Sequence, residues 1–171
     1  MTFTPLSRRR TLACVGAVAA GLAGCAETDD RATTDTATTG AGDTASADLN
    51  LREANVVAVT VETEGGNGDY RFEVTLIHDD DGENGYADWW QVETLAGGRL
   101  GRRELAHPHG TREFTRSTTV SIPEGTTCVV VRGHDQTHDY GGQAMLVRVE
   151  TGGETAVRQG PERRSVADRA C

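Results

Sequence analysis

The feature that most constrains the fold is a two-residue alternation of apolar and polar side chains. Over residues 57–62 and 71–76, Val, Phe and Leu alternate with small, polar or charged residues. Because successive side chains of a strand point to opposite faces, this period predicts half-buried β-strands rather than helices. Clusters of Gly, Asp, Asn and Pro interrupt it at short intervals, as turns would. We therefore predict an all-β fold, an immunoglobulin-like antiparallel β-sandwich of about seven to eight strands.

Eight segments fit the strand pattern: 54–63, 70–77, 87–94, 99–106, 114–121, 127–133, 143–150 and 154–159. Trp89 and Trp90 are adjacent in the third of them, so their rings point to opposite faces of the sheet. We expect one ring in the core and the other on the surface.

The first 24 residues are typical of an export signal. Ser7-Arg8-Arg9 followed by Leu12 resembles the twin-arginine motif, and the apolar run that follows is too short to span a bilayer. Residues 22–25, Leu-Ala-Gly-Cys, resemble a lipobox, in which Cys25 is alkylated by a glycerol lipid and becomes the new amino terminus. A plain secretory signal followed by an incidental cysteine is the alternative, and the small residues directly before Cys25 disfavour it. We predict a lipid-anchored protein on the outer face of the cytoplasmic membrane.

The charge composition limits which classes of partner the protein can bind. All 17 basic residues are Arg, and three of them precede Cys25, which leaves 14 against 26 acidic residues and a net charge of −12. Such an acidic, lysine-free surface is typical of halophilic archaea, although a GC-rich genome would also disfavour Lys codons. The negative charge argues against nucleic acid and against anionic lipid surfaces, because both would repel it. The predicted membrane link is therefore the lipid on Cys25 alone.

The mature chain divides by composition into three parts. Residues 25–48 hold the lipid-bearing cysteine and then almost entirely Thr, Ala, Asp and Gly, without a large apolar side chain, which predicts a disordered tether. Residues 49–159 form the β domain, and the polar residues 160–171 a flexible tail. Cys128 and Cys171 could form a disulfide outside the membrane, or remain as a buried thiol and a frayed terminus.

The positions of the five histidines suggest a shared site. If each strand reverses the direction of the one before it, the second, fourth and sixth strands end at the same pole of the sandwich. All five histidines lie at or just after those ends: His78, His107, His109, His134 and His138. The argument depends only on the number of reversals and not on which sheet each strand joins.

The local spacings suit metal ligation. His107-Pro108-His109 places two imidazoles on one side of an extended segment, and His134 and His138 bracket a short loop. Imidazoles suit Zn(II) or Cu(II), so we predict a divalent-metal site formed by these four residues, with His78 peripheral. Carboxylates near in sequence could orient the rings: Glu104, Asp135 and Asp139. The alternative is that the histidines cap loops, bond to backbone or are solvated.

A second cation site is suggested by the acidic segment that follows the second strand. Its carboxylates alternate around glycine as in a Ca²⁺ loop, and the candidate ligands are Asp79, Asp81, Glu83 and Asp88. The spaced terminal Glu of an EF-hand is missing, and acidic turns are common in halophiles.

Residues 86–142 resemble a family of small exported proteins of bacteria and archaea without an established function. The matching residues are Tyr86-Ala87-Asp88-x-Trp90, Leu100-Gly101-x-Arg103, Leu105-Ala106-His107-Pro108-His109, Phe114-Thr115-Arg116-Ser117, Ile122-Pro123-x-Gly125 and His134-Asp135-x-x-His138. With the signal segment, the whole chain resembles a haloarchaeal twin-arginine lipoprotein. The family resemblance of residues 86–142 covers about a third of the chain and implies no catalytic residue.

Two functions remain open. The first is a cell-surface protein that binds Zn(II) or Cu(II) through the histidines. The alternative is a structural or adhesive module that binds an envelope protein or a glycan at the same pole, with the exposed tryptophan as the contact. An enzyme is disfavoured, because the sequence has no nucleophile elbow, phosphate-binding glycine loop or defensible Ser/His/Asp order.

Overall fold

The computed structural model describes residues 49–79 and 82–171, which contain nine strands and no helix. The strands are β1 (Asn55–Glu64), β2 (Asp69–Ile77), β3 (Ala87–Thr94), β4 (Arg99–Glu104), β5 (Phe114–Ser121), β6 (Cys128–Asp135), β7 (Asp139–Tyr140), β8 (Gln143–Arg148) and β9 (Glu154–Arg158). Arg8, Arg9, Cys25, the predicted tether and Asp81 lie outside the described residues.

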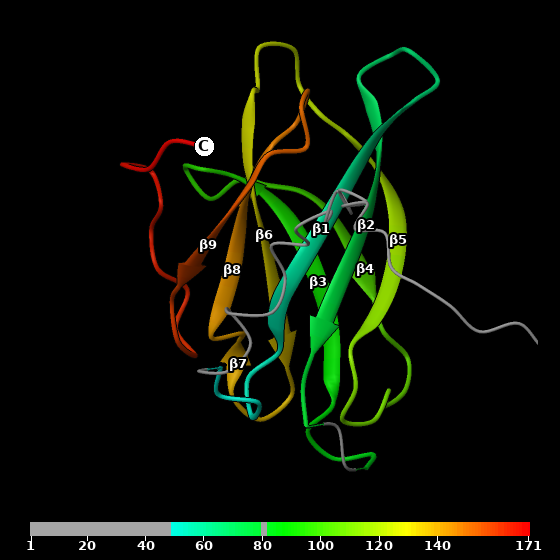
Figure 1. The fold of residues 1–171 in the computed structure, drawn as a ribbon, viewed down its shortest axis with the longest axis vertical. Helices are drawn as coiled ribbons and strands as arrows, with labels where there is room; N and C mark the ends of the chain where they lie inside the picture. The colour runs from blue at the N-terminus through cyan, green and yellow to red at the C-terminus, as the bar shows by residue number, and fades with distance from the viewer. Residues whose placement is uncertain (1–48, 80–81) are drawn as a thin grey trace, which may run out of the picture. The chain divides into compact units, whose positions relative to one another are not determined.

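The strands form two antiparallel sheets. One has the order β1-β2-β5, and the other has the order β4-β3-β6-β8-β9 with β7 paired to β6 (Figure 1). The prediction of an all-β sandwich is confirmed. The structure adds β7, a two-residue strand too short for any periodic pattern to reveal.

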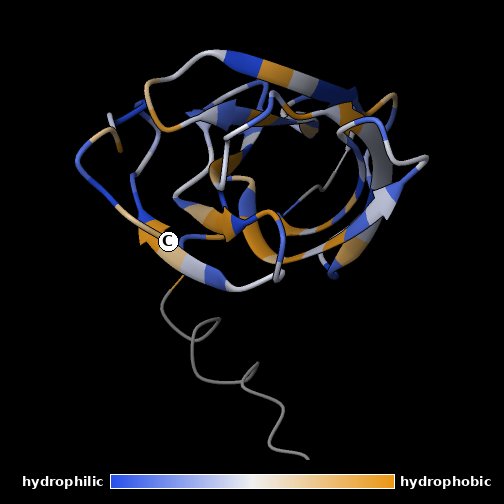
Figure 2. Ribbon diagram, turned by 90° about the horizontal axis from the view of Figure 1, so that it is seen from above, coloured by the Kyte–Doolittle hydropathy of each residue, from blue (hydrophilic) through white to orange (hydrophobic). Residues whose placement is uncertain are grey.

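The larger sheet is apolar on both faces. On β6, Val129 and Val131 point into the core between the sheets, whereas Val130 belongs to a second cluster with Ala144 and Leu146. Figure 2 shows hydrophobic and hydrophilic residues alternating along the strands. Since an uncovered apolar face would be exposed to water, the outer face of β6 and β8 needs a cover.

The carboxyl-terminal segment, residues 159–171, provides that cover. Val166 is buried in the outer cluster, and a disulfide joins Cys128 of β6 to Cys171. The sequence led us to expect a flexible tail over residues 160–171, because that segment is locally polar. Its one valine and its terminal cysteine reach partners far away in sequence, which local composition cannot reveal.

Strand β6 extends two residues beyond the predicted end at residue 133. It runs through His134 and Asp135, which therefore point to opposite faces of the sheet. Strand β4 instead ends at Glu104, two residues before the predicted boundary.

The segment before β1 lies against two glycines, Gly133 of β6 and Gly141 between β7 and β8. A Cβ on Gly133 would lie 2.1 Å from the carbonyl oxygen of Ala54, and one on Gly141 would lie 1.8 Å from the same atom. Any side chain at either position would overlap with backbone, so both residues must be glycine for the segment before β1 to pack there.

We expect Gly141→Ala to lower the free energy of unfolding by roughly 2–3 kcal/mol, because overpacking against backbone cannot be relieved by a rotamer change. The measurement is a urea titration at constant salt. Gly153→Ala is the matched control, since a Cβ there would meet its nearest neighbour at an ordinary 3.6 Å. Equal midpoints for the two variants would contradict the close approach of Ala54.

Candidate functional site: the histidine pole

The ends of β2, β4 and β6 lie at one pole of the sandwich, as the count of strand reversals predicted (Figure 1). The first residues of β3 pair with the last residues of both neighbours, Ala87 with Asp135 and Trp89 with Glu104. His78 follows β2 in the other sheet, and its Nε2 lies 3.8 Å from Asp135 Oδ2, across the gap between the sheets. We call this end the histidine pole and define it by His78, His107, His109, His134 and His138.

The first group at the pole is centred on the buried carboxylate of Asp135. This residue has no exposed surface, and its Oδ1 accepts hydrogen bonds from the backbone N–H groups of Thr137 (2.8 Å) and His138 (2.6 Å). These two bonds close the hairpin between β6 and β7. The other oxygen, Oδ2, has no hydrogen-bond partner among the described residues.

Two imidazoles border that carboxylate. His138 Nδ1 lies 3.3 Å from Asp135 Oδ1 and has no hydrogen-bond partner within the described residues. His78 is buried, and its Nε2 donates a hydrogen bond to the carbonyl oxygen of Arg52 at 2.9 Å. The same Nε2 lies 3.8 Å from Asp79 Oδ1. The His138 side chain is 36% exposed, so this group is open to solvent on one side.

The second group lies on the outer face of the larger sheet around His134. Its Nδ1 lies 2.7 Å from Asp88 Oδ1, and its Nε2 lies 3.8 Å from Asp139 Oδ1. The His134 ring stacks on Trp89 with centroids 4.2 Å apart, and Tyr140 meets both rings edge-on. Here Asp88 orients the imidazole and Trp89 supports it.

The structure buries both tryptophans, contrary to the expectation of one surface ring. Trp90 lies in the core with no exposed surface, and Trp89 is only 7% exposed. On the outer face, the guanidinium of Arg102 lies 3.7 Å from the centre of the Trp89 ring, and His134 stacks on it. The strand pattern placed one tryptophan ring on the surface, and the cation–π contact from Arg102 on the neighbouring strand covers that ring. Trp89 is therefore not a free contact for a glycan.

The third group contains the His107–His109 pair on the loop after β4. The two ring centroids lie 4.7 Å apart, and His109 stacks on Phe114 at 3.9 Å. His107 Nδ1 contacts the carbonyl oxygen of Pro108 at 3.2 Å. The pair thus packs on the start of β5.

The predicted four-histidine cluster is therefore divided. Over residues 49–79 and 82–171, no three His, Cys, Asp or Glu side chains are already arranged as a metal-binding group. Of the carboxylates predicted to orient the rings, Asp135 lies beside His138, and Asp139 lies 3.8 Å from His134. Glu104 lies 3.8 Å from Arg102 instead.

The candidate calcium ligands within the described residues are also engaged separately. Asp88 bonds to His134, and Asp79 lies beside His78. Glu83 is exposed, and Asp81 is outside the described residues.

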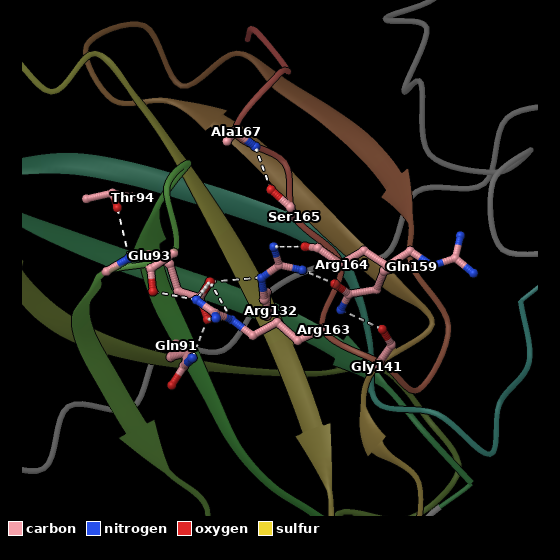
Figure 3. A network of polar contacts seen from close by, with 12 residues as sticks. Gln91, Glu93, Thr94, Arg132, Gly141, Gln159, Arg163, Arg164, Ser165 and Ala167 are labelled. Carbon is pink, nitrogen blue, oxygen red and sulfur yellow. Dashed lines mark hydrogen bonds and ion pairs between the residues drawn. The ribbon is translucent and has the colours of Figure 1, made fainter.

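Sequence reasoning missed a polar network on the outer face of the larger sheet (Figure 3). Glu93 and Arg132 are fully buried, and Arg132 Nε donates to Glu93 Oε2 at 3.0 Å. Arg163, from the carboxyl-terminal segment, bonds to the same carboxylate through Nε (3.2 Å) and Nη2 (3.0 Å). The available signal was a charged residue directly after an apolar one in each of two strands, Glu93 after Val92 and Arg132 after Val131.

The structure contains no helix long and apolar enough to cross a membrane within residues 49–79 and 82–171.

The chain is similar to a protein of Halomicrobium mukohataei named "Putative lipoprotein". The two are 66% identical over 126 residues, which cover 74% of this chain and 62% of the relative. At this identity the two chains are homologous. This chain therefore spans less than two thirds of the length of the relative that it matches. No model of a known protein family and no solved structure matches the chain.

Proposed function

We propose that this protein is an exported lipoprotein that binds a divalent transition metal at the histidine pole. The lipid anchor is supported by the lipobox that ends at Cys25 and by the name of the Halomicrobium relative. The twin-arginine motif at Arg8 and Arg9 directs export, so the β-sandwich faces the outside of the cytoplasmic membrane. The excess of acidic residues suits a salt-rich environment. The genus name of the relative's source organism, Halomicrobium, points to the same environment.

The observation that carries the metal proposal is the half-satisfied carboxylate of Asp135. An ionised carboxylate without exposed surface is costly unless charges or hydrogen bonds compensate both oxygens. Backbone N–H groups compensate Oδ1, whereas Oδ2 and the neighbouring His138 Nδ1 have no hydrogen-bond partner among the described residues. A divalent cation held by these two atoms would satisfy both at once.

The remaining ligands come from the other sheet. His78 Nε2 would exchange the Arg52 carbonyl for the ion and would bind it as the neutral ring with its proton on Nδ1, and Asp79 borders the same Nε2 atom. A site of two imidazoles and a carboxylate suits Zn(II), and Cu(II) is the second choice. Relative to the sequence prediction, Asp135 becomes a ligand and His107, His109 and His134 are left out.

The metal proposal is tested by calorimetric titration of the purified chain with Zn(II), Cu(II) and Ca(II). We expect saturable Zn(II) binding, and we expect His138→Ala to weaken it at least about tenfold, the loss of one direct ligand. Asp135→Asn, which keeps the shape and removes the charge, should do the same if circular dichroism shows an unchanged fold.

The control is His107→Ala, which should bind as the wild type does. If His107→Ala/His134→Ala weakens binding while His138→Ala does not, the sequence-predicted ligand set is the right one. Absence of saturable binding to the wild type would reject the metal function altogether.

The anchor is tested separately in cells. Cys25→Ala should abolish incorporation of labelled lipid and release the mature protein from the membrane fraction, because the lipid is the membrane link. Arg8→Lys/Arg9→Lys should leave unprocessed precursor inside the cell. A Cys25→Ala protein that still sediments with membranes would show that another part of the chain holds it there.

A further inference from the structure

A small cavity lies between the turn that follows β3 and the carboxyl-terminal segment. Its volume is 160 Å³, and it is lined by the turn residues 95–97, by Ser165 and by three arginines: Arg132, Arg163 and Arg164. Among the described residues, no acidic side chain lines it, although Glu93 bonds to two of the arginines. The cavity is lined by basic residues and, within the described part of the chain, by no histidine, although the protein as a whole is acidic.

Two of these guanidinium groups hold unused hydrogen-bond donors. A guanidinium has five N–H groups. Arg132 donates three of them, to Glu93, to Gln159 Oε1 and to the carbonyl oxygen of Arg164. Arg163 bonds to Glu93 and Gly97 through Nε and Nη2, whereas its Nη1 has no hydrogen-bond partner within the described part of the chain.

Gly97 makes room for the Arg163 guanidinium. A Cβ at position 97 would lie 2.4 Å from Nη2 and 3.3 Å from Nη1. The glycine also has a φ of +93°, which other residues rarely adopt. The turn therefore lets a guanidinium lie across its backbone at the edge of the cavity.

The charges at this cavity do not balance. Glu93 is the one carboxylate bonded to Arg132 and Arg163 among the described residues, and it already accepts bonds from both and from Gln91. The hydrogen bonds that Arg163 donates to Glu93 raise the pKa of Arg163, against the lowering caused by burial, so Arg163 stays charged. Two guanidinium groups face one carboxylate, in a protein whose overall charge is strongly negative.

We propose that this cavity binds a small oxyanion: a carboxylate, sulfate or phosphate group. The planar forks of arginine match the paired oxygens of such groups, and Ser165, whose Oγ accepts a hydrogen bond from the Ala167 N–H, also lines the cavity. The volume of 160 Å³ is about five times the share of one water in liquid water, enough for one oxyanion with some water. The bound anion would fasten residues 163–165 to the turn after β3.

The test is a titration followed by the backbone and arginine Nε–H signals in NMR spectra of the full chain. Sodium sulfate, phosphate and acetate are added at constant ionic strength with chloride as the balancing anion. We expect saturable shifts at residues 95–97 and 163–165 with at least one oxyanion. Local shifts are preferred to melting temperatures, because sulfate stabilises folded proteins in general.

Arg163→Gln should raise the dissociation constant at least about tenfold, since it removes a charge and paired donors. Arg163→Lys keeps the charge and loses the fork, so it should bind at intermediate strength even if the Gln variant loosens the segment. Arg99→Gln, on the exposed start of β4, is the control and should bind as the wild type does. Linear drift without saturation, or an unchanged dissociation constant in Arg163→Gln, would overturn the proposal. Because none of these residues borders Asp135, the result does not depend on the metal proposal.

Discussion

Replacing Glu93 by alanine should lower the free energy of unfolding by about 3–5 kcal/mol, the usual result of breaking a buried ion pair. Glu93 and Arg132 are both fully buried, and their closest atoms are 3.0 Å apart. Removing the carboxylate leaves the Arg132 charge away from water without a counter-ion. It also frees Arg163, which holds the carboxyl-terminal segment to the same atom.

The measurement is a denaturant titration of Glu93→Ala beside a surface control. Glu73→Ala removes the partner of Arg71, a pair of similar length (3.2 Å) whose side chains are both 42% exposed. Exposed pairs contribute about 0–1 kcal/mol, and salt screens them further. If the two variants lose equal stability, burial of the Glu93–Arg132 pair is not what stabilises this face.

Reduction of the Cys128–Cys171 disulfide should cost about 3–4 kcal/mol. The bond closes a loop of 43 residues, and opening it returns that much conformational freedom to the unfolded chain. The structure also places it at the end of the segment that covers the outer apolar cluster. We therefore expect residues 159–171 to lose protection from hydrogen exchange first, beginning around Val166.

Unfolding in the presence and absence of a thiol-free reductant measures the effect directly. The double variant Cys128→Ser/Cys171→Ser should match the reduced wild type and should not respond to the reductant. A wild-type midpoint that reductant leaves unchanged would mean that the other contacts of the segment, such as Arg163 with Glu93, hold it alone.

Much of the fold could be predicted from the sequence because strand formation leaves a local mark. The alternation around Phe72 and the valines of β1 identified two strands that the structure places in the smaller sheet, and the glycine-rich turns separated the strands. Ends of strands were less predictable. Strand β6 continues to Asp135 because β3 pairs with it there, and a polar residue next to a glycine gives no local sign of such pairing.

The sequence predicted at which end of the sandwich the histidines lie, but not which of them lie close together. The number of reversals is a property of the chain order, so it brought all five histidines to one pole. Which way each ring points depends on register: a strand that extends through His134 and Asp135 sends one to the outer face and the other into the core. That single step separates His134 from the Asp135 group.

The sequence alone determined that this chain is an all-β protein whose histidines gather at one end, because a period of two and an order of turns are written in local residue types. It also carries the export and lipid-attachment motifs, which remain predictions for the residues before 49. Only the tertiary structure decided which partners the charged side chains meet. Asp135 is buried beside His138, Glu93 is buried beside Arg132, and residues 159–171 return over the larger sheet. These contacts depend on strand register or join residues that are distant along the chain. Such contacts are selected by the free energy of covering apolar faces and pairing buried charges, which no local pattern encodes.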